Sequence, residues 1–167
     1  STGILNNVKA VGELTKNTDI LLVVDTISGL VANEFEFDGW NVDVAVAGSQ
    51  KAFLIPPGLA FLAMSEKAKK ALDRSDLPKY YFDIKQAVKA LESKAETPYT
   101  PAIGLIIAAN ASCKMIVEKG VDNIVKEKYD LRKHIENELL NLKFDILVKD
   151  EENRSNTLIS VVKDGVK

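Results

Sequence analysis

A lysine and an aspartate that each follow a predicted strand are the two residues of this sequence best suited to chemistry. Asp25 comes directly after the continuous apolar run 20–24, and Lys51 comes after the short strand expected over 42–47 and a short polar segment. A continuous apolar run is typical of a strand buried on both faces, as in a parallel sheet covered by helices. Loops at the carboxyl ends of such strands form functional sites, so we expect Asp25 and Lys51 at one edge of one sheet.

Lys51 has the surroundings that Schiff-base chemistry requires. It precedes an apolar turn over 52–58, which predicts a poorly solvated pocket for the side-chain amine. Desolvation disfavours the ammonium form, so that the free amine becomes available as a nucleophile toward an aldehyde. From its placement alone, an ordinary lysine that reaches solvent is the alternative interpretation.

Asp25 supplies the group that completes such a site. A carboxylate at the same sheet edge can pair with a protonated pyridine nitrogen and keep the ring an effective electron sink. A lysine and this pyridinium partner are the two protein groups that pyridoxal phosphate most needs. An aspartate after a strand also often caps a turn or a helix, and the context 24–29 allows both interpretations.

Thr100 is a third candidate, because it precedes a proline at the start of an apolar segment. Thr100 fits a helix N-cap and Pro101 the first helical position. The helix expected over 102–119 is apolar nearly all round, which predicts a position in the interior. A hydroxyl, free backbone N–H groups and the positive end of a helix dipole together suit an anion; a plain helix cap is the alternative.

The remaining residues predict an alternation of strands and helices, which is typical of an α/β fold. Ser65 and Asp83 fit the N-caps of two short helices. The further elements expected are helices over 4–14, 65–72, 83–91, 102–119 and from 121 onward, and strands over 59–64, 144–148 and 157–162.

The motifs around these candidates resemble those of the class V aminotransferases, nearest to alanine–glyoxylate and serine–pyruvate aminotransferase. In chain order they are 1–5 (STGIL), 23–29 (VVDTISG), 48–52 (GSQKA), 56–59 (PPGL), 81–85 (YFDIK) and 97–101 (TPYTP). Their order and spacing make a strong signal over nearly the whole chain. The resemblance implies an α/β chain of the fold-type I pyridoxal-phosphate-dependent transferases. Residues 1–119 would belong to the large, mostly parallel-sheet domain, as its second half, and 120–167 would begin the small α+β domain without completing it.

The resemblance also implies a reaction and the residues that perform it. The reaction is transamination of a small amino acid, alanine or serine, with a 2-oxo acid, glyoxylate or pyruvate. Lys51 would form the internal aldimine and move the proton between the substrate Cα and the cofactor C4′. Asp25 would keep the pyridine nitrogen protonated, and Gln50 would lie near the cofactor phosphate.

A homodimer is implied as well, because this family builds its site at the subunit interface. Thr100 would contact the phosphate of the neighbouring subunit, with Tyr99 or Thr97 beside it. The family's phosphate loop and ring-stacking residue come before Ser1, and its substrate-binding arginine comes after residue 167. We therefore expect this chain to be part of a longer protein.

Composition excludes several other classes. The 22 basic and 24 acidic residues are mixed along 167 residues, with a net charge of −2, so a nucleic-acid surface is not expected. No stretch approaches the ~20 apolar residues that span a bilayer. The single cysteine, Cys113, excludes an internal disulfide and a multi-cysteine zinc site; we expect no metal and a cytoplasmic location.

Two rivals stay open at this point. A cysteine desulfurase is a related fold, but desulfurases carry histidine immediately before the lysine, where this chain has Gln50, and their nucleophilic cysteine lies on a mobile loop, unlike Cys113. The other rival is a catalytically incomplete piece that only folds or pairs with a partner.

Overall fold

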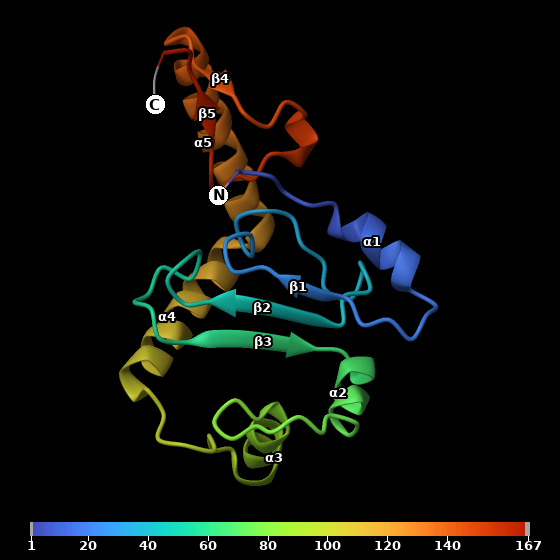
Figure 1. Cartoon of the computed structure of the whole chain (residues 1–167). Coiled ribbons are helices and arrows are strands. Elements are labelled where there is room, and N and C mark those ends of the chain that lie inside the picture. The colour runs from blue at the N-terminus through green and yellow to red at the C-terminus, as the bar shows by residue number, and fades with distance from the viewer. Residues whose placement is uncertain (1, 166–167) are drawn as a thin grey trace.

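The computed structural model describes residues 2–165, and Figure 1 shows a sheet flanked by helices, with the last long helix leading away from it toward the C-terminal strands. Among the residues described, no helix combines the length and apolar character needed to cross a membrane. In chain order the elements are α1 (Val8–Thr15), β1 (Val23–Asp25), β2 (Val44–Gly48), β3 (Ala60–Met64), α2 (Glu66–Leu72), α3 (Ile84–Lys94), α4 (Ile103–Lys119), α5 (Val121–Asn141), β4 (Asp145–Ile146), the 3₁₀ turn η1 (Glu151–Asn153) and β5 (Val161–Val162).

The three-stranded sheet has the order β1-β2-β3, so β2 is its central strand. β2 runs parallel to β1, with Asp25 opposite Val46, and antiparallel to β3. The loop 49–59 joins β2 to β3 and makes the antiparallel return. Since β1 and β2 run in the same direction, Asp25 and the loop that carries Lys51 come to the same edge of the sheet.

Two predicted helix caps are confirmed. Ser65 Oγ accepts a hydrogen bond of 3.1 Å from Ala68 N at the start of α2. Asp83 Oδ1 accepts one of 3.2 Å from Gln86 N at the start of α3. Each bond satisfies a backbone donor that the first helical turn leaves unpaired.

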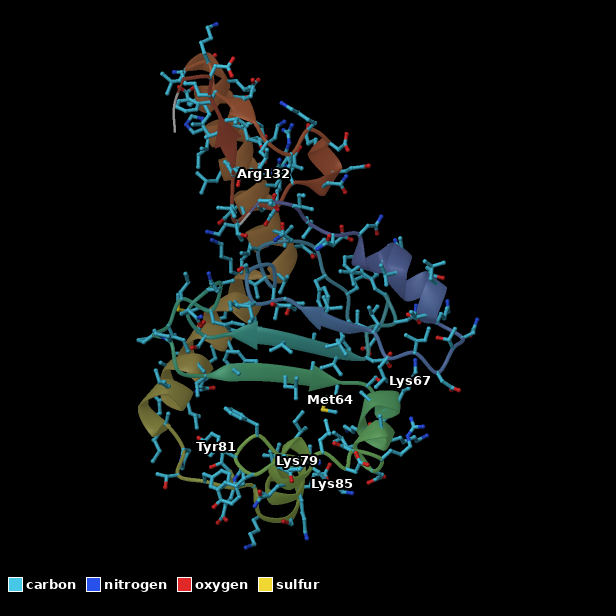
Figure 2. The ribbon with its side chains drawn as sticks, in the orientation of Figure 1. Met64, Lys67, Lys79, Tyr81, Lys85 and Arg132 are labelled. Atoms are coloured by element: carbon cyan, nitrogen blue, oxygen red, sulfur yellow. The ribbon has the colours of Figure 1, made fainter. Side chains whose placement is uncertain are left out.

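Asp43 fastens the end of the sheet opposite the candidate site. Its side chain is 6% exposed and accepts hydrogen bonds from Leu22 N at 2.9 Å and Ser65 Oγ at 2.7 Å. Lys67, which extends from α2 in Figure 2, adds an ion pair of 3.2 Å. One carboxylate therefore joins the entry of β1, the entry of β2 and the cap of α2.

The predicted N-cap of the apolar helix is wrong by two residues. α4 begins after Ala102, and Thr100 is neither its N-cap nor hydrogen-bonded to its first turn. Ile103 N donates to Pro101 O at 3.0 Å, and Ala102 has φ −76° and ψ 73°. These angles are those of an inverse γ-turn, which delays the first helical residue to Ile103.

The expected burial of α4 and β1 on all sides is also wrong for the described residues. Ile107 of α4 is 65% exposed and Val23 of β1 is 61% exposed. Within α4, Ala109 and Ser112 are the buried residues. These elements are packed on one side, and their apolar residues on the other side are open to solvent in this chain.

The C-terminal part is built on α5 and is organised by buried charges. Arg132 and Glu136 lie one helical turn apart, are 3% and 2% exposed, and form an ion pair of 2.8 Å. Arg154 contacts the second carboxylate oxygen of Glu136 at 3.2 Å. Figure 2 shows Arg132 on α5, far from Tyr81 below the sheet.

Candidate active site

An open pocket of about 890 Å³ lies where the amino-terminal segment, the end of β1 and the C-terminal segment meet. Leu5 N donates to Asn153 O at 2.8 Å and Ser155 N donates to Gly3 O at 2.9 Å, so that two segments far apart in sequence form one wall. Asp25 and Lys51 both line the pocket, together with Ile27, Ser28 and Trp40. Its volume lies in the range of small-molecule sites.

Lys51 reaches this pocket from the loop between β2 and β3. The residue is exposed, so the predicted desolvation of its amine is wrong for this part of the chain. The apolar turn that follows Lys51 packs on α4 and β3, through Ser112 and Phe61, instead of covering the lysine. An amine exposed beside a pocket is nonetheless accessible to an aldehyde that enters it.

Asp25 caps the turn after β1, which is one of the two roles that its sequence context allowed. Its Oδ1 accepts a hydrogen bond of 2.9 Å from Ile27 N, which caps the turn after β1. Its Oδ2 makes no hydrogen bond to any residue of 2–165, and the side chain is exposed at the pocket wall. The turn therefore fixes the direction of the carboxylate and leaves one oxygen open to a cationic donor.

Thr26 holds the loop after Asp25 against the central strand. Its backbone N and its Oγ1 both donate to Val46 O, at 2.9 and 2.7 Å. Val46 is also the residue opposite Asp25 in the ladder. Thr26 was not predicted as a site residue, although its position directly after the aspartate was an available signal.

The same loop is held from the C-terminal part by an asparagine pair. Asn156 N donates to Asn33 Oδ1 at 2.8 Å, and Asn156 Nδ2 donates to Ala32 O at 2.9 Å. Between them and Asp25, Val31 adopts φ 70°, which is a strained conformation for a β-branched residue. No sequence signal connects residues 123 positions apart.

Gln50 precedes Lys51 but lies outside the pocket lining. It is exposed, and its amide lies against Gly48, where an added Cβ would be 2.9 Å from the Gln50 Oε1. In this chain its side chain thus folds back along the β2 end.

Thr100, Tyr99 and Thr97 are not brought to the pocket. Tyr99 stacks on Tyr81 at 4.8 Å between ring centroids, and its hydroxyl donates to Tyr80 O at 3.1 Å. Thr97 Oγ1 donates to Tyr99 O at 2.6 Å, while Thr100 is exposed. These residues form a separate aromatic surface on the far side of the sheet.

Comparison with known proteins defines the fold first. The structure matches a crystal structure of alanine–glyoxylate aminotransferase from a Nostoc species with a TM-score of 0.89 and 29% identity, over 99% of this chain and 45% of that one. The fold is that of the fold-type I aminotransferases.

The sequence comparison then gives the family. The model of the aminotransferase class-V family matches residues 1–167. The chain is 39% identical to the L-aspartate–glyoxylate aminotransferase of Paracoccus denitrificans over 126 residues, and 38% identical to the serine–glyoxylate aminotransferase of Arabidopsis thaliana over 127 residues. These matches cover 74% and 75% of this chain but 32% of each relative. The chain belongs to the class V aminotransferases and spans about a third of the length of these relatives.

Proposed function

We propose that the protein carrying this chain transfers an amino group from a small amino acid, alanine or serine, to a 2-oxo acid, glyoxylate or pyruvate, with pyridoxal phosphate. The observation that carries the proposal is that Asp25 and Lys51 line one pocket at the ends of adjacent parallel strands. Family membership supports the same reaction class. The three relatives differ in their amino donor but share glyoxylate in their names, which favours glyoxylate as the acceptor.

The residues present fit this cofactor. Pyridoxal phosphate supplies an aldehyde carbon and a protonated pyridine ring that withdraws electrons when it is bound. The Lys51 amine is accessible for the aldehyde and for carrying a proton to and from the substrate Cα. The free Oδ2 of Asp25 can accept a hydrogen bond from the ring nitrogen and hold its proton in place, because Ile27 N fixes the other oxygen.

The remaining contacts are proposed to come from two subunits. Gln50 would lie near the cofactor phosphate once the pocket is completed. Thr100 and Tyr99 would serve the site of a second copy, because they are remote from the pocket of their own chain. The exposed rings of Tyr81 (62%) and Phe82 (87%) support an interface there, since contiguous exposed apolar surface marks interaction sites.

The first test is to identify the lysine that binds the cofactor. Pyridoxal phosphate is added, the adduct is reduced with borohydride, and the labelled lysine is mapped by mass spectrometry. The test is run on this chain and on a chimaera that completes it with the missing segments of the Nostoc relative. Selective labelling of Lys51 is expected in the chimaera, and Lys51→Ala should abolish it. Labelling of scattered surface lysines with Lys51 spared would refute the proposal.

The acceptor is tested with the chimaera in the same preparation. Serine is offered as the amino donor with glyoxylate or with pyruvate, and the glycine or alanine formed is quantified; alanine is offered as the donor with glyoxylate alone, and the glycine formed is quantified. Glyoxylate should be the better acceptor. Equal or better turnover with pyruvate would refute the preference for glyoxylate while leaving the cofactor site intact.

A further inference from the structure

The loop 49–59, which carries Lys51, is closed on itself by one buried serine. Ser49 is 0% exposed. Its Oγ donates to Pro56 O at 2.8 Å and accepts from Leu59 N at 3.2 Å, and its backbone N donates to Leu59 O at 3.1 Å. A single side chain two positions before Lys51 thus joins both ends of the loop.

A second buried serine holds the middle of the same loop from α4. Ser112, 9% exposed, donates its Oγ hydrogen to Phe53 O, across 59 positions of sequence. The Phe53 ring packs on Phe61 of β3 at 4.4 Å between centroids. The part of the loop after Lys51 is therefore fixed to α4 and β3.

These bonds hold a backbone that would otherwise relax. Leu54, which lies between the two anchor points, has φ 56° and is 82% exposed, so its own side chain contributes little to keeping it there. A non-glycine residue in the left-handed region persists only where its surroundings determine it. Leu54 N also donates to Lys51 O at 3.0 Å, which links this strained residue directly to the lysine.

We propose that Ser49 and Ser112 are positioning residues for Lys51, which direct its amine into the pocket by holding the 49–59 loop. The proposal rests on the proposed role of Lys51 as the cofactor lysine. A lysine side chain has a flexible four-carbon stem, so the orientation of its backbone decides how often the amine reaches a given point. Loss of either hydroxyl leaves the carbonyl of a part-buried hydrogen bond without its donor, and the loop can leave the strained conformation.

The test measures labelling of Lys51 by pyridoxal phosphate and borohydride relative to Lys128, an exposed lysine on α5 in the same molecule. Ser49→Ala and Ser112→Ala should each lower the Lys51/Lys128 ratio by about tenfold, the scale expected when a reacting group is misplaced or a buried hydrogen bond is lost. Ser112→Thr, which keeps the hydroxyl, should retain the ratio of the parent chain. Ser93→Ala, which removes an exposed hydroxyl bonded to Lys89 O within α3, is the matched control and should change nothing.

The outcomes separate this proposal from the one on which it rests. Urea unfolding of each variant identifies conditions in which every variant is folded. Under these conditions the Lys51/Lys128 labelling ratio reports on the native loop. Absence of selective Lys51 labelling in the parent chain and in its chimaera would refute the cofactor role itself. Selective labelling that is unchanged in Ser49→Ala and Ser112→Ala, or equally low in Ser112→Thr and Ser112→Ala, would overturn the positioning role alone.

Discussion

Replacing Asp43 by alanine should destabilise the chain more than the small size of the aspartate side chain suggests. The buried carboxylate accepts hydrogen bonds from Leu22 N and Ser65 Oγ, and each such bond to a charged acceptor contributes about 1.5 kcal/mol. The pair with Lys67 adds only ~0.5 kcal/mol, because the lysine side chain is 37% exposed. These contributions are not fully additive, so we expect Asp43→Ala to lower the free energy of unfolding by about 3 kcal/mol.

The same side chain predicts how stability depends on pH. Desolvation raises the pKa of Asp43, but hydrogen bonds from Leu22, Ser65 and Lys67, with the charge on Lys67, outweigh it and hold the pKa below its ordinary value of 3.8. A carboxyl whose pKa is lowered by folding contributes stability above the unfolded pKa and loses it as the pH falls through the folded pKa. The Asp43 contribution is therefore expected to be complete at neutral pH and to be lost progressively as the pH falls below about 4 and through the folded pKa.

Urea unfolding followed by circular dichroism, at neutral pH and between about pH 2 and 5, measures both effects. Asp43→Asn, which keeps the shape but cannot ionise, should flatten the acid limb of the stability profile. Asp76→Ala, at an exposed aspartate, is the control and should stay within about 0.5 kcal/mol of the parent chain. A loss below ~1 kcal/mol for Asp43→Ala, or an unchanged acid limb for Asp43→Asn, would refute the reasoning.

Three further perturbations follow from features described above or from the backbone. Glu136→Ala should lower the free energy of unfolding in urea by about 4 kcal/mol, because it removes the carboxylate that Arg132 and Arg154 share and leaves Arg132, 3% exposed, with only the longer pair of 3.9 Å to Glu151; a cost near zero would mean that water replaces the carboxylate. Ala95→Gly should raise the free energy of unfolding by about 1 kcal/mol, since Ala95 ends α3 with φ 52°, a conformation that glycine adopts without strain. The control Ala90→Gly, inside α3, should lower the free energy of unfolding by about the same amount. Tyr81→Ser should weaken self-association in sedimentation of the chimaera at least tenfold, and unchanged association would exclude the aromatic surface from the interface.

Local features of the structure could be predicted from sequence, and contacts between distant segments could not. Ser65 and Asp83 cap helices through bonds to residues three positions away, so their roles are visible in the sequence pattern. The Thr100 prediction followed the same rule and failed, because a γ-turn at Ala102 competes with the helix and has no distinctive residue pattern. Helix starts are thus predictable only where the capping bond has no local competitor.

In the candidate site, too, the local features could be predicted from sequence and the contacts between distant segments could not. Asp25 and Lys51 could be placed at one sheet edge, because apolar runs followed by polar residues define the ends of parallel strands. The exposure of Lys51 was not predictable, since solvation depends on what packs nearby and not on the residues that flank it. The bond between Ser112 and the Lys51 loop spans 59 positions, and nothing in the local sequence of either segment indicates the other.

The segment between β1 and β2 is where this protein can accommodate insertions and deletions. Every residue of 26–43 lies outside regular helices and strands, and the connection still returns to a fixed register with Asp25 opposite Val46. Extra residues at its exposed part, around Glu36 and Asp38, would leave that register untouched. One residue inserted after Val46 would instead turn the following side chains to the opposite face of the sheet. Insertions and deletions should therefore accumulate between the two strands, while the distance in sequence from Val46 to Lys51 stays constant.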